Sequence, residues 1–313
     1  MQKRFLSVRP VFWAAAVVFF LPFFAIGDGP DRLYVDADAS GTQDGSKDHP
    51  FETISQAIDR VDDNDGTKIY VAEGEYEDNF NIPEDAQVIG AGADETIIDS
   101  DNDRGAVVYM EHGTKLSGVT LRGAEIGVMV KEDSRADIYD SVIKDNDHEG
   151  VFLLGTGSHK DRWKATIANT VIEENGRSGV YANDRPVVIV DSVIKDNEGD
   201  GINLSDDVKL WLEDTTVEDN HKSGIFAILD GSDIHVIDCE LKDNGREGME
   251  VDAFGKEGYV KVDNTNIEDN DRWGFARVAR TPGIDAVWSD VVLKKNDFDG
   301  NDFGSVSPVV KMW

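Results

Sequence analysis

Two stretches decide the fold: residues 140–151, which read DSVIKDNDHEGV, and residues 191–202, which read DSVIKDNEGDGI. Both are copies of a unit that occurs seven times, each with an Asn followed four positions later by a Gly: Asn146/Gly150, Asn175/Gly179, Asn197/Gly201, Asn220/Gly224, Asn244/Gly248, Asn270/Gly274 and Asn296/Gly300. Successive Asn residues are 29, 22, 23, 24, 26 and 26 positions apart. A fixed turn combined with a loop of variable length is typical of a solenoid.

Alignment of the copies on the Asn gives columns of like residues. Three positions before the Asn the residues are apolar: Ile143, Ile172, Ile194, Val217, Leu241, Ile267 and Leu293. Five positions before it they are mostly small and polar: Ser141, Thr170, Ser192, Thr215, Cys239, Thr265 and Val291. We therefore interpret Cys239 as a small buried residue rather than a reactive thiol. After the Gly, apolar residues alternate with others, which predicts short strands and not helices.

A charged column gives a separate indication of how the coils stack. Two positions before the Asn the sign alternates without exception: Lys144, Glu173, Lys195, Glu218, Lys242, Glu268 and Lys294. Opposite charges on adjacent strands attract, whereas like charges directly opposite one another are destabilising. The column therefore predicts parallel strands in register, with one copy of the unit in each coil.

Coils of 22–29 residues with about three short strands each resemble the right-handed parallel β-helix proteins of the pectin-lyase-like superfamily, in which an Asn ladder occupies one tight turn. The N-terminal segments 34–36, 50–58 and 69–76 fit the same resemblance. It implies an all-β fold, a right-handed parallel β-helix of about ten coils. It also implies a short N-terminal capping helix near residues 53–61, which would cover the exposed strand edges and core of the first coil.

The first 27 residues are typical of a secretory signal peptide. Lys3, Arg4 and Arg9 precede or enter an apolar run at residues 11–26, and a small-residue site follows at residues 25–27. The alternative is an uncleaved N-terminal anchor. We expect residues 28–313 to be one domain outside the cytoplasm, with the cap and first coils at 28–100 and the regular Asn-ladder coils at 101–313. The chain is expected to be a monomer without membrane contact beyond the signal or anchor segment, and it could be one fragment of a larger surface protein.

The chain is strongly acidic, with 63 acidic against 31 basic residues and a net charge of −32. This charge argues against a nucleic-acid partner, and it would repel polyanions unless bound cations or a local basic patch intervened. An acidic residue precedes the ladder Asn in most copies, including Asp196, Asp219 and Asp243. Such a row offers carboxylate ligands for Ca²⁺, and the alternative is a solvated acidic face.

The resemblance implies that functional residues lie on the outer face of the strand that follows the Gly. Two outward columns are predicted there: Val107, Met129, Phe152, Tyr181, Asn203, Phe226, Glu250 and Ala276, and then Tyr109, Lys131, Leu154, Asn183, Ser205, Ile228, Asp252 and Val278. Aromatic rings can hold sugar rings and amides can bond their hydroxyls. The predicted binding residues are Phe152, Tyr181, Asn183, Asn203 and Phe226. The alternative is that the aromatic residues simply fill a pleated surface.

The longest coil carries an insertion at residues 155–164, directly after this strand. It concentrates cationic and aromatic side chains that would suit an acidic sugar: His159, Lys160, Arg162 and Trp163. The alternative is an ordinary exposed loop.

These features predict an exported β-helix protein that binds an extracellular polysaccharide or a cell-surface partner along its outer strand face. The alternative is a polysaccharide lyase or glycoside hydrolase with Glu250 and Asp252 as acid and base. The sequence motifs of pectin methylesterases, polygalacturonases and alginate epimerases are missing, so no catalytic residue is carried over from the resemblance.

Overall fold

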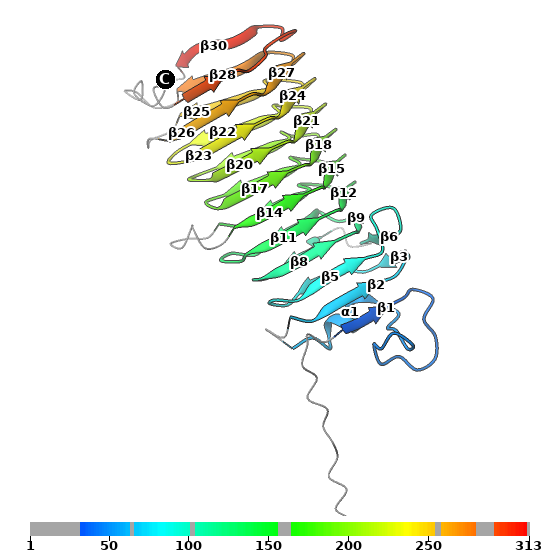
Figure 1. The fold of residues 1–313 in the computed structure, drawn as a ribbon. Helices are drawn as coiled ribbons and strands as arrows, with labels where there is room; N and C mark the ends of the chain where they lie inside the picture. The colour runs from blue at the N-terminus through cyan, green and yellow to red at the C-terminus, as the bar shows by residue number, and fades with distance from the viewer. Residues whose placement is uncertain are drawn as a thin grey trace, which may run out of the picture.

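The computed structural model describes residues 32–62, 66–100, 104–155, 164–253, 258–279 and 291–311. Residues 1–27, the predicted signal segment, lie outside the described residues. The described chain forms a single elongated stack of coils, with β1 at one end and β30 at the other (Figure 1). Among the described residues, no helix is long and apolar enough to cross a membrane.

The described strands form three parallel sheets. The eleven-stranded sheet contains β1 (Arg32–Val35), β2 (Lys68–Val71), β5 (Gln87–Gly90), β8 (Thr114–Ser117), β11 (Ala136–Tyr139), β14 (Ala165–Ala168), β17 (Pro186–Val190), β20 (Lys209–Glu213), β23 (Asp233–Ile237), β26 (Tyr259–Asp263) and β29 (Val291–Lys294). The nine-stranded sheet contains β3 (Gly74–Glu77), β6 (Thr96–Asp99), β9 (Thr120–Arg122), β12 (Val142–Lys144), β15 (Val171–Glu173), β18 (Val193–Lys195), β21 (Thr216–Glu218), β24 (Glu240–Lys242) and β27 (Asn266–Glu268). The ten-stranded sheet contains β4 (Phe80–Ile82), β7 (Ala106–Met110), β10 (Ile126–Val130), β13 (Val151–Leu153), β16 (Val180–Asn183), β19 (Ile202–Ser205), β22 (Ile225–Leu229), β25 (Met249–Ala253), β28 (Trp273–Ala279) and β30 (Gly304–Lys311).

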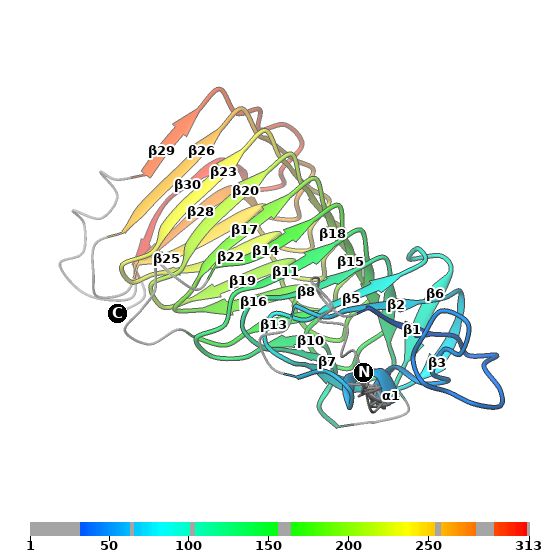
Figure 2. The same ribbon diagram turned by 60° about the horizontal axis from the view of Figure 1, so that its bottom comes forward.

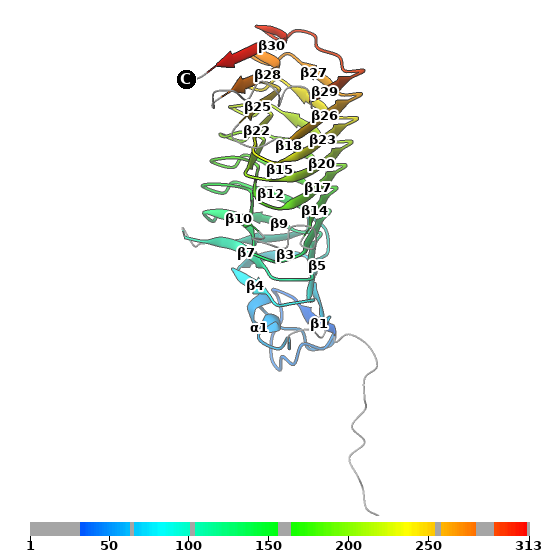
Figure 3. The same ribbon diagram turned by 90° about the vertical axis from the view of Figure 1, so that its left-hand side faces the viewer.

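Each coil contributes one strand to each sheet, in the order eleven-stranded, nine-stranded, ten-stranded. Nine such coils follow one another from β2 to β28, so the coil count differs slightly from the expected ten. Figures 2 and 3 show the strands of each sheet succeeding one another along the stack. The parallel β-helix predicted from the repeat is thereby confirmed.

The predicted capping helix is present but shorter than expected. Helix α1 (Ile54–Ile58) begins after Thr53, whose hydroxyl accepts the backbone N–H of Gln56, while the Gln56 side chain accepts the backbone N–H of Thr53. This capping box satisfies donors that the first helical turn leaves unpaired. Ile54 and Ala57 are buried, and the helix packs against β1, β2 and β4 at the N-terminal end.

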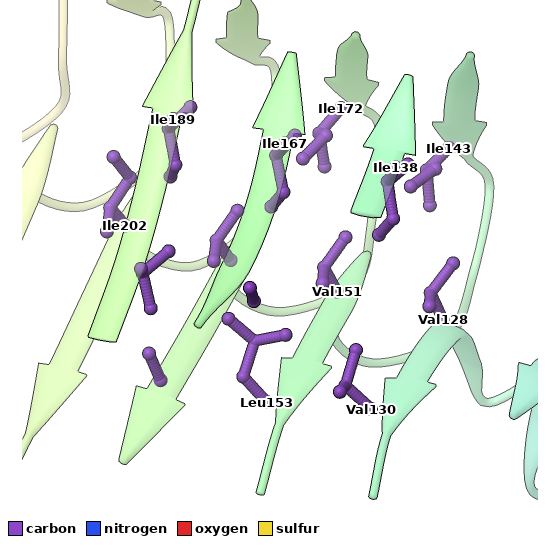
Figure 4. Close-up of a cluster of buried hydrophobic side chains, with 14 of the residues drawn as sticks. Val128, Val130, Ile138, Ile143, Val151, Leu153, Ile167, Ile172, Ile189 and Ile202 are labelled. Atoms are coloured by element: carbon purple, nitrogen blue, oxygen red, sulfur yellow. The ribbon is translucent and has the colours of Figure 1, made fainter. Parts of the chain in front are cut away.

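The interior of the coils is a continuous apolar core to which all three sheets contribute. Figure 4 shows side chains of successive coils stacked one over the next, among them Ile143 and Ile172, Ile138 and Ile167, and Val128 and Val151. These residues are 0–1% exposed. Each column thus places similar apolar side chains at the same position in successive coils, which allows dense packing from coil to coil.

The Asn ladder forms at the corner between the nine-stranded and ten-stranded sheets. The Nδ2 of each ladder Asn donates to the Oδ1 of the next, at 3.0 Å from Asn146 to Asn175 and 3.1 Å from Asn220 to Asn244. The glycine of the repeat lies against this ladder. A Cβ added to Gly224 would lie 2.7 Å from the carbonyl oxygen of Gly248 and 2.9 Å from Asn244 Nδ2. The close approach of neighbouring backbones therefore requires glycine at this position.

The last repeat departs from the predicted alignment. Asn270 Nδ2 donates to Asn301 Oδ1 at 2.8 Å, so the ladder continues at Asn301 and not at Asn296. The Oδ1 of Asn296 instead accepts the backbone N–H of Thr265 at 3.0 Å. In earlier coils the equivalent backbone N–H groups donate to side-chain hydroxyl groups, as Thr170 does to Ser192. The prediction failed because an Asn side chain can accept either bond.

This shift changes the last member of several columns. Leu293 pairs with Val262 and Lys294 pairs with Asp263, so neither occupies its predicted column, and the predicted place of Val291 is also wrong. The first six residues of the charged column, from Lys144 to Glu268, do pair with one another on adjacent strands, as predicted. Cys239 is buried among the small residues, as predicted, and burial raises the pKa of its thiol to about 12.

Candidate functional site

The outer face of the ten-stranded sheet carries the predicted functional column. Its members are direct partners in successive strands from Met129 to Ala276: Met129, Phe152, Tyr181, Asn203, Phe226, Glu250 and Ala276. The N-terminal member was assigned wrongly, because Tyr109 and not Val107 pairs with Met129. Val107 is buried. The first coils lack a ladder Asn, so the alignment had no anchor there.

The first part of the site is an aromatic pocket of about 350 Å³ on this face. The rings of Phe152 and Tyr181 stack with their centroids 4.9 Å apart and their planes 15° apart. The pocket is lined by Glu132, Phe152, Leu153, Leu154, Gly155, Tyr181, Asn183 and Asp184. Each of the two rings covers one face of the other. A ligand therefore contacts the ring edges and the two faces that remain open. Asn203 and Phe226 share the column but do not line this pocket.

A buried arginine holds the coils beside the aromatic pocket together. Arg185 is fully buried, and its Nη2 donates to the carbonyl oxygens of Lys131 at 3.0 Å and Ser134 at 2.9 Å. Both acceptors lie two coils back, whereas ladder bonds join adjacent coils. Arg185 therefore bridges the coil that carries the insertion at 155–164. Burial lowers the pKa of the Arg185 guanidinium to about 10, which leaves it charged at neutral pH.

The four predicted residues of the insertion, His159, Lys160, Arg162 and Trp163, lie outside the described residues. Their assignment to the binding site stays a prediction.

The second part of the site is a carboxylate pocket near the C-terminal end of the same face. It has a volume of about 290 Å³ and is lined by Arg246, Glu247, Glu250, Arg272, Trp273, Ala276, Val278, Phe303, Ser307 and Val310. Glu250 and Asp252, predicted as outward carboxylates, are only 5% and 2% exposed. Of the two, Glu250 reaches the pocket and Asp252 is absent from its lining.

Glu250 lies within a network of charged and polar groups. Its Oε2 is 3.2 Å from Arg246 Nη2 and accepts the Ser223 hydroxyl at 3.5 Å. The same hydroxyl lies 3.4 Å from Glu247 Oε2, so the two carboxyl groups are neighbours. Burial, followed by the negative charge of Glu247, raises the pKa of Glu250 to about 7 against the opposing effect of Arg246. A carboxyl group with such a pKa can hold a proton at neutral pH and release it.

Arg246, Glu247 and Arg272 line the carboxylate pocket but are not among the site residues predicted from the sequence. The repeat nevertheless marks their positions. They lie two or three positions after the ladder Asn, in columns that the alignment on Asn also defines. A nearby member of the same columns, Asp200, accepts the Asn203 amide at 2.9 Å and the backbone N–H of Ser223 at 3.1 Å. Burial raises the pKa of Asp200.

The acidic row proposed for Ca²⁺ has a conformational explanation. Asp196, Asp219 and Asp243 have φ values of 55°, 53° and 54°, in the left-handed region that Asp adopts more readily than most residues. All three are exposed. In the part of the chain that the structure describes, no group of three or more His, Cys, Asp or Glu side chains could hold a metal ion. The calcium hypothesis therefore gains no support from the geometry.

Comparison with known families supports the fold. The family described as "Right handed beta helix region" matches residues 154–309, and the family "Protein of unknown function (DUF1565)" matches residues 37–95. No curated protein sequence matches the chain. The chain is therefore a right-handed parallel β-helix protein. More particularly, its repeated coils give it a fold like that of the pectin-lyase-like repeat proteins.

Three solved structures illustrate the likeness. XylC in complex with xylose has a TM-score of 0.62 and 11% identity, over 80% of this chain and 67% of that one. Geobacillus virus E2 ORF18 has a TM-score of 0.60 and 12% identity, over 89% and 60%. Pectate lyase Pel9A has a TM-score of 0.51 and 14% identity, over 91% and 79%. At these identities the likeness establishes the fold alone.

Proposed function

We propose that this protein is exported and, as a monomer, binds an extracellular polysaccharide along the outer face of the ten-stranded sheet. The observation that carries the proposal is the aromatic pocket at Phe152 and Tyr181. Pockets for small polar ligands combine apolar and aromatic walls with a few polar groups that fix orientation. Here Asn183, Glu132 and Asp184 supply those polar groups. Similar folds in complex with xylose and in a pectate lyase are consistent with a sugar ligand.

Phe152→Ala is expected to weaken polysaccharide binding about tenfold. It removes one of the two stacked rings, and aromatic side chains in such pockets commonly contribute more than about 1 kcal/mol to binding. The measurement is titration calorimetry of residues 28–313 against a panel of neutral and uronate polysaccharides. Phe226→Ala should have a smaller effect, because Phe226 shares the column but does not line the pocket.

Trp211→Ala is the matched control, since Trp211 is 40% exposed on β20 of the eleven-stranded sheet. It should leave binding unchanged. If Phe152→Ala binds as tightly as the original protein, or if Trp211→Ala weakens binding equally, the aromatic pocket is not the binding site. Failure to bind any polysaccharide in the panel would remove the proposed function.

A second candidate function is hydrolysis or elimination on the same polysaccharide, and the carboxylate pocket favours it. Glu250 has the pKa of a general acid, and Glu247 and two arginines lie beside it. Asp252, the sequence-predicted partner of Glu250, does not line the pocket, so Glu247 is the better candidate for the second carboxylate.

Glu250→Gln is expected to abolish release of reducing or unsaturated ends if the protein is an enzyme. The amide keeps the shape and hydrogen-bonding capacity of the side chain but has no proton to transfer. Binding at the aromatic pocket should persist. Product release by the Glu250→Gln protein at the original rate, or the absence of products from the original protein, would exclude this candidate.

A further inference from the structure

A stack of three aromatic rings lies on the outer face of the eleven-stranded sheet, a different sheet from that of the two pockets. It consists of Trp211 on β20, His235 on β23 and Tyr259 on β26, which are adjacent strands (Figure 1). The ring centroids of Trp211 and His235 are 5.2 Å apart, and those of His235 and Tyr259 are 5.4 Å apart. None of the three lines the aromatic or the carboxylate pocket. The aromatic stack therefore takes no part in the functions proposed above.

The aromatic stack ends at Trp211, which leaves one face of the indole open. His235, the partner of Trp211 on β23, covers one face with its plane only 21° away. On the other side Trp211 pairs with Val188 and Val188 pairs with Thr166, so no ring continues the stack there. Trp211 is 40% exposed, and its indole N–H donates to Glu213 Oε2 at 2.8 Å. The open indole face is thus held in a fixed orientation.

The strands that carry the aromatic stack also carry a concentrated negative charge. Residues 206–214 and 230–238 form β20, β23 and the turns beside them, and Lys209 is their only basic residue apart from His235. They contain seven acidic residues: Asp206, Asp207, Glu213, Asp214, Asp230, Asp233 and Asp238. Desolvation, followed by the negative charges of Asp191 and Asp238, raises the pKa of Asp214. These carboxylates repel one another, so a cation bound among them would relieve the repulsion.

The open indole face and the carboxylates favour the same kind of ligand group. The face of an indole carries negative electrostatic potential and attracts an ammonium or guanidinium group. A chain of sugar rings would need several open ring faces, whereas both faces of His235 are covered by its neighbours. An anion would be repelled by the carboxylates. The side chain of a lysine or arginine therefore suits both features.

The spacing of these groups suits an extended peptide. Asp207 lies four residues before Trp211, and Asp214 lies three residues after it. At about 3.3 Å per residue of strand, both are roughly 10–13 Å from Trp211. An extended chain advances about 3.3–3.6 Å per residue. Basic side chains three or four residues apart can therefore contact the indole face and a flanking carboxylate at the same time.

We propose that the outer face of β20 and β23 binds an extended, arginine- or lysine-rich segment of a partner protein, with one cation over the open face of Trp211. This surface is separate from the proposed polysaccharide site on the ten-stranded sheet. The net charge of −32 would attract such a segment over a long range, and it would repel a second copy of this chain.

The probe is a fluorescent glycine- and serine-based peptide with an arginine at every third position, and fluorescence anisotropy measures its binding. A control peptide carries citrulline, a neutral analogue, in place of each arginine. Trp211→Ala is expected to weaken binding of the arginine peptide about two- to fivefold, the effect of one cation–π contact at an exposed site. Phe226→Ala should leave this binding unchanged, because it removes an aromatic ring from β22 of the ten-stranded sheet.

Asp214→Asn tests the carboxylates, with Asp219→Asn as its matched control. Both residues are exposed turn residues of the same coil, with φ values of 46° and 53°, a conformation that Asn also adopts. Asp219 lies at the corner between the nine-stranded and ten-stranded sheets, away from β20. Asp214→Asn is expected to weaken binding of the arginine peptide about twofold, and the effect should diminish with added salt. Asp219→Asn should have a smaller effect.

The outcomes separate this inference from the proposed function. Weaker binding of the arginine peptide by Trp211→Ala and Asp214→Asn than by their controls supports the inference. No binding by the original protein, equal binding by Trp211→Ala, or equal binding of the citrulline peptide overturns it and leaves the proposed polysaccharide site standing. Loss of polysaccharide binding in Trp211→Ala would instead identify the aromatic stack as a sugar-binding surface and overturn both proposals.

Discussion

Asn220→Ala is expected to lower the free energy of unfolding by about 4 kcal/mol. Asn220 lies in the middle of the ladder and is 1% exposed. Its Nδ2 donates to Asn244 Oδ1 and to the carbonyl oxygens of Ile194 and Glu218, at 2.9–3.1 Å. Its Oδ1 accepts both the backbone N–H and the Nδ2 of Asn197. Alanine would leave buried donors and acceptors without partners in two coils, and each costs about 1–3 kcal/mol.

Chemical denaturation followed by circular dichroism measures this loss, with Asn266→Ala as the matched control. Asn266 lies on β27 and its side chain is exposed, so the control should change stability by less than about 0.5 kcal/mol. A repeat protein need not unfold in one step, so the comparison requires a single transition in both variants. Equal stability of Asn220→Ala and Asn266→Ala would contradict the role of the ladder.

The fold was predictable because the repeat fixes one residue per coil. Once Asn146 and Asn175 are taken as stacked, the period of two in the strands determines which side chains point inward. The structure confirms that alternation at Val151 and Phe152, which are buried and half-buried, respectively. The alignment failed at the C-terminal end, where Asn296 and Asn301 compete for the ladder position. A sequence pattern does not reveal which of two similar side chains reaches the ladder, because that depends on the path of the chain around the coil.

The candidate site was predictable only in part. Phe152, Tyr181 and Asn183 could be placed on one face from spacing alone, and the pocket unites them. The burial of Glu250 could not be foreseen, because it depends on the corner residues Arg246 and Glu247 folding over the edge of the sheet. Columns indicate which residues are stacked. They do not indicate how far a long side chain extends from its own column into the next.

The burial of Glu250 leads to a second large effect. Glu250→Gln is expected to raise the free energy of unfolding at pH 8 by up to about 3 kcal/mol and to change it little at pH 4. Glu247 and Asp252 add negative charge next to Glu250, Arg246 opposes them, and Ser223 donates a hydrogen bond. Burial and these charges raise the pKa of Glu250 from 4.5 to about 7. Between these two values the folded protein binds more protons than the unfolded chain, so its stability falls as pH rises.

Above pH 7 the ionised Glu250 of the folded protein therefore carries its full destabilising effect, at about 1.4 kcal/mol per unit of pKa. A glutamine at this position has no proton to lose. It can still accept bonds from Ser223 and Arg246, and its amide can donate to Glu247. The difference in unfolding free energy between the two proteins should grow between pH 4.5 and 7 and stay constant above. The other acidic groups titrate in both proteins, so their contributions cancel in this difference. Asp200 is one of them, and its raised pKa also makes stability fall as pH rises.

Glu240→Gln is the matched control, because the Glu240 side chain is 49% exposed on β24 and ion pairs of exposed side chains contribute little to stability. Denaturation at pH 4, 6 and 8 measures the three proteins in parallel. A difference for Glu250→Gln that does not vary with pH would mean that the carboxyl group titrates normally. The pocket would then hold an ionised carboxylate paired with Arg246. That result would remove the general acid that the enzymatic candidate requires and leave the aromatic pocket as the candidate site on the outer face.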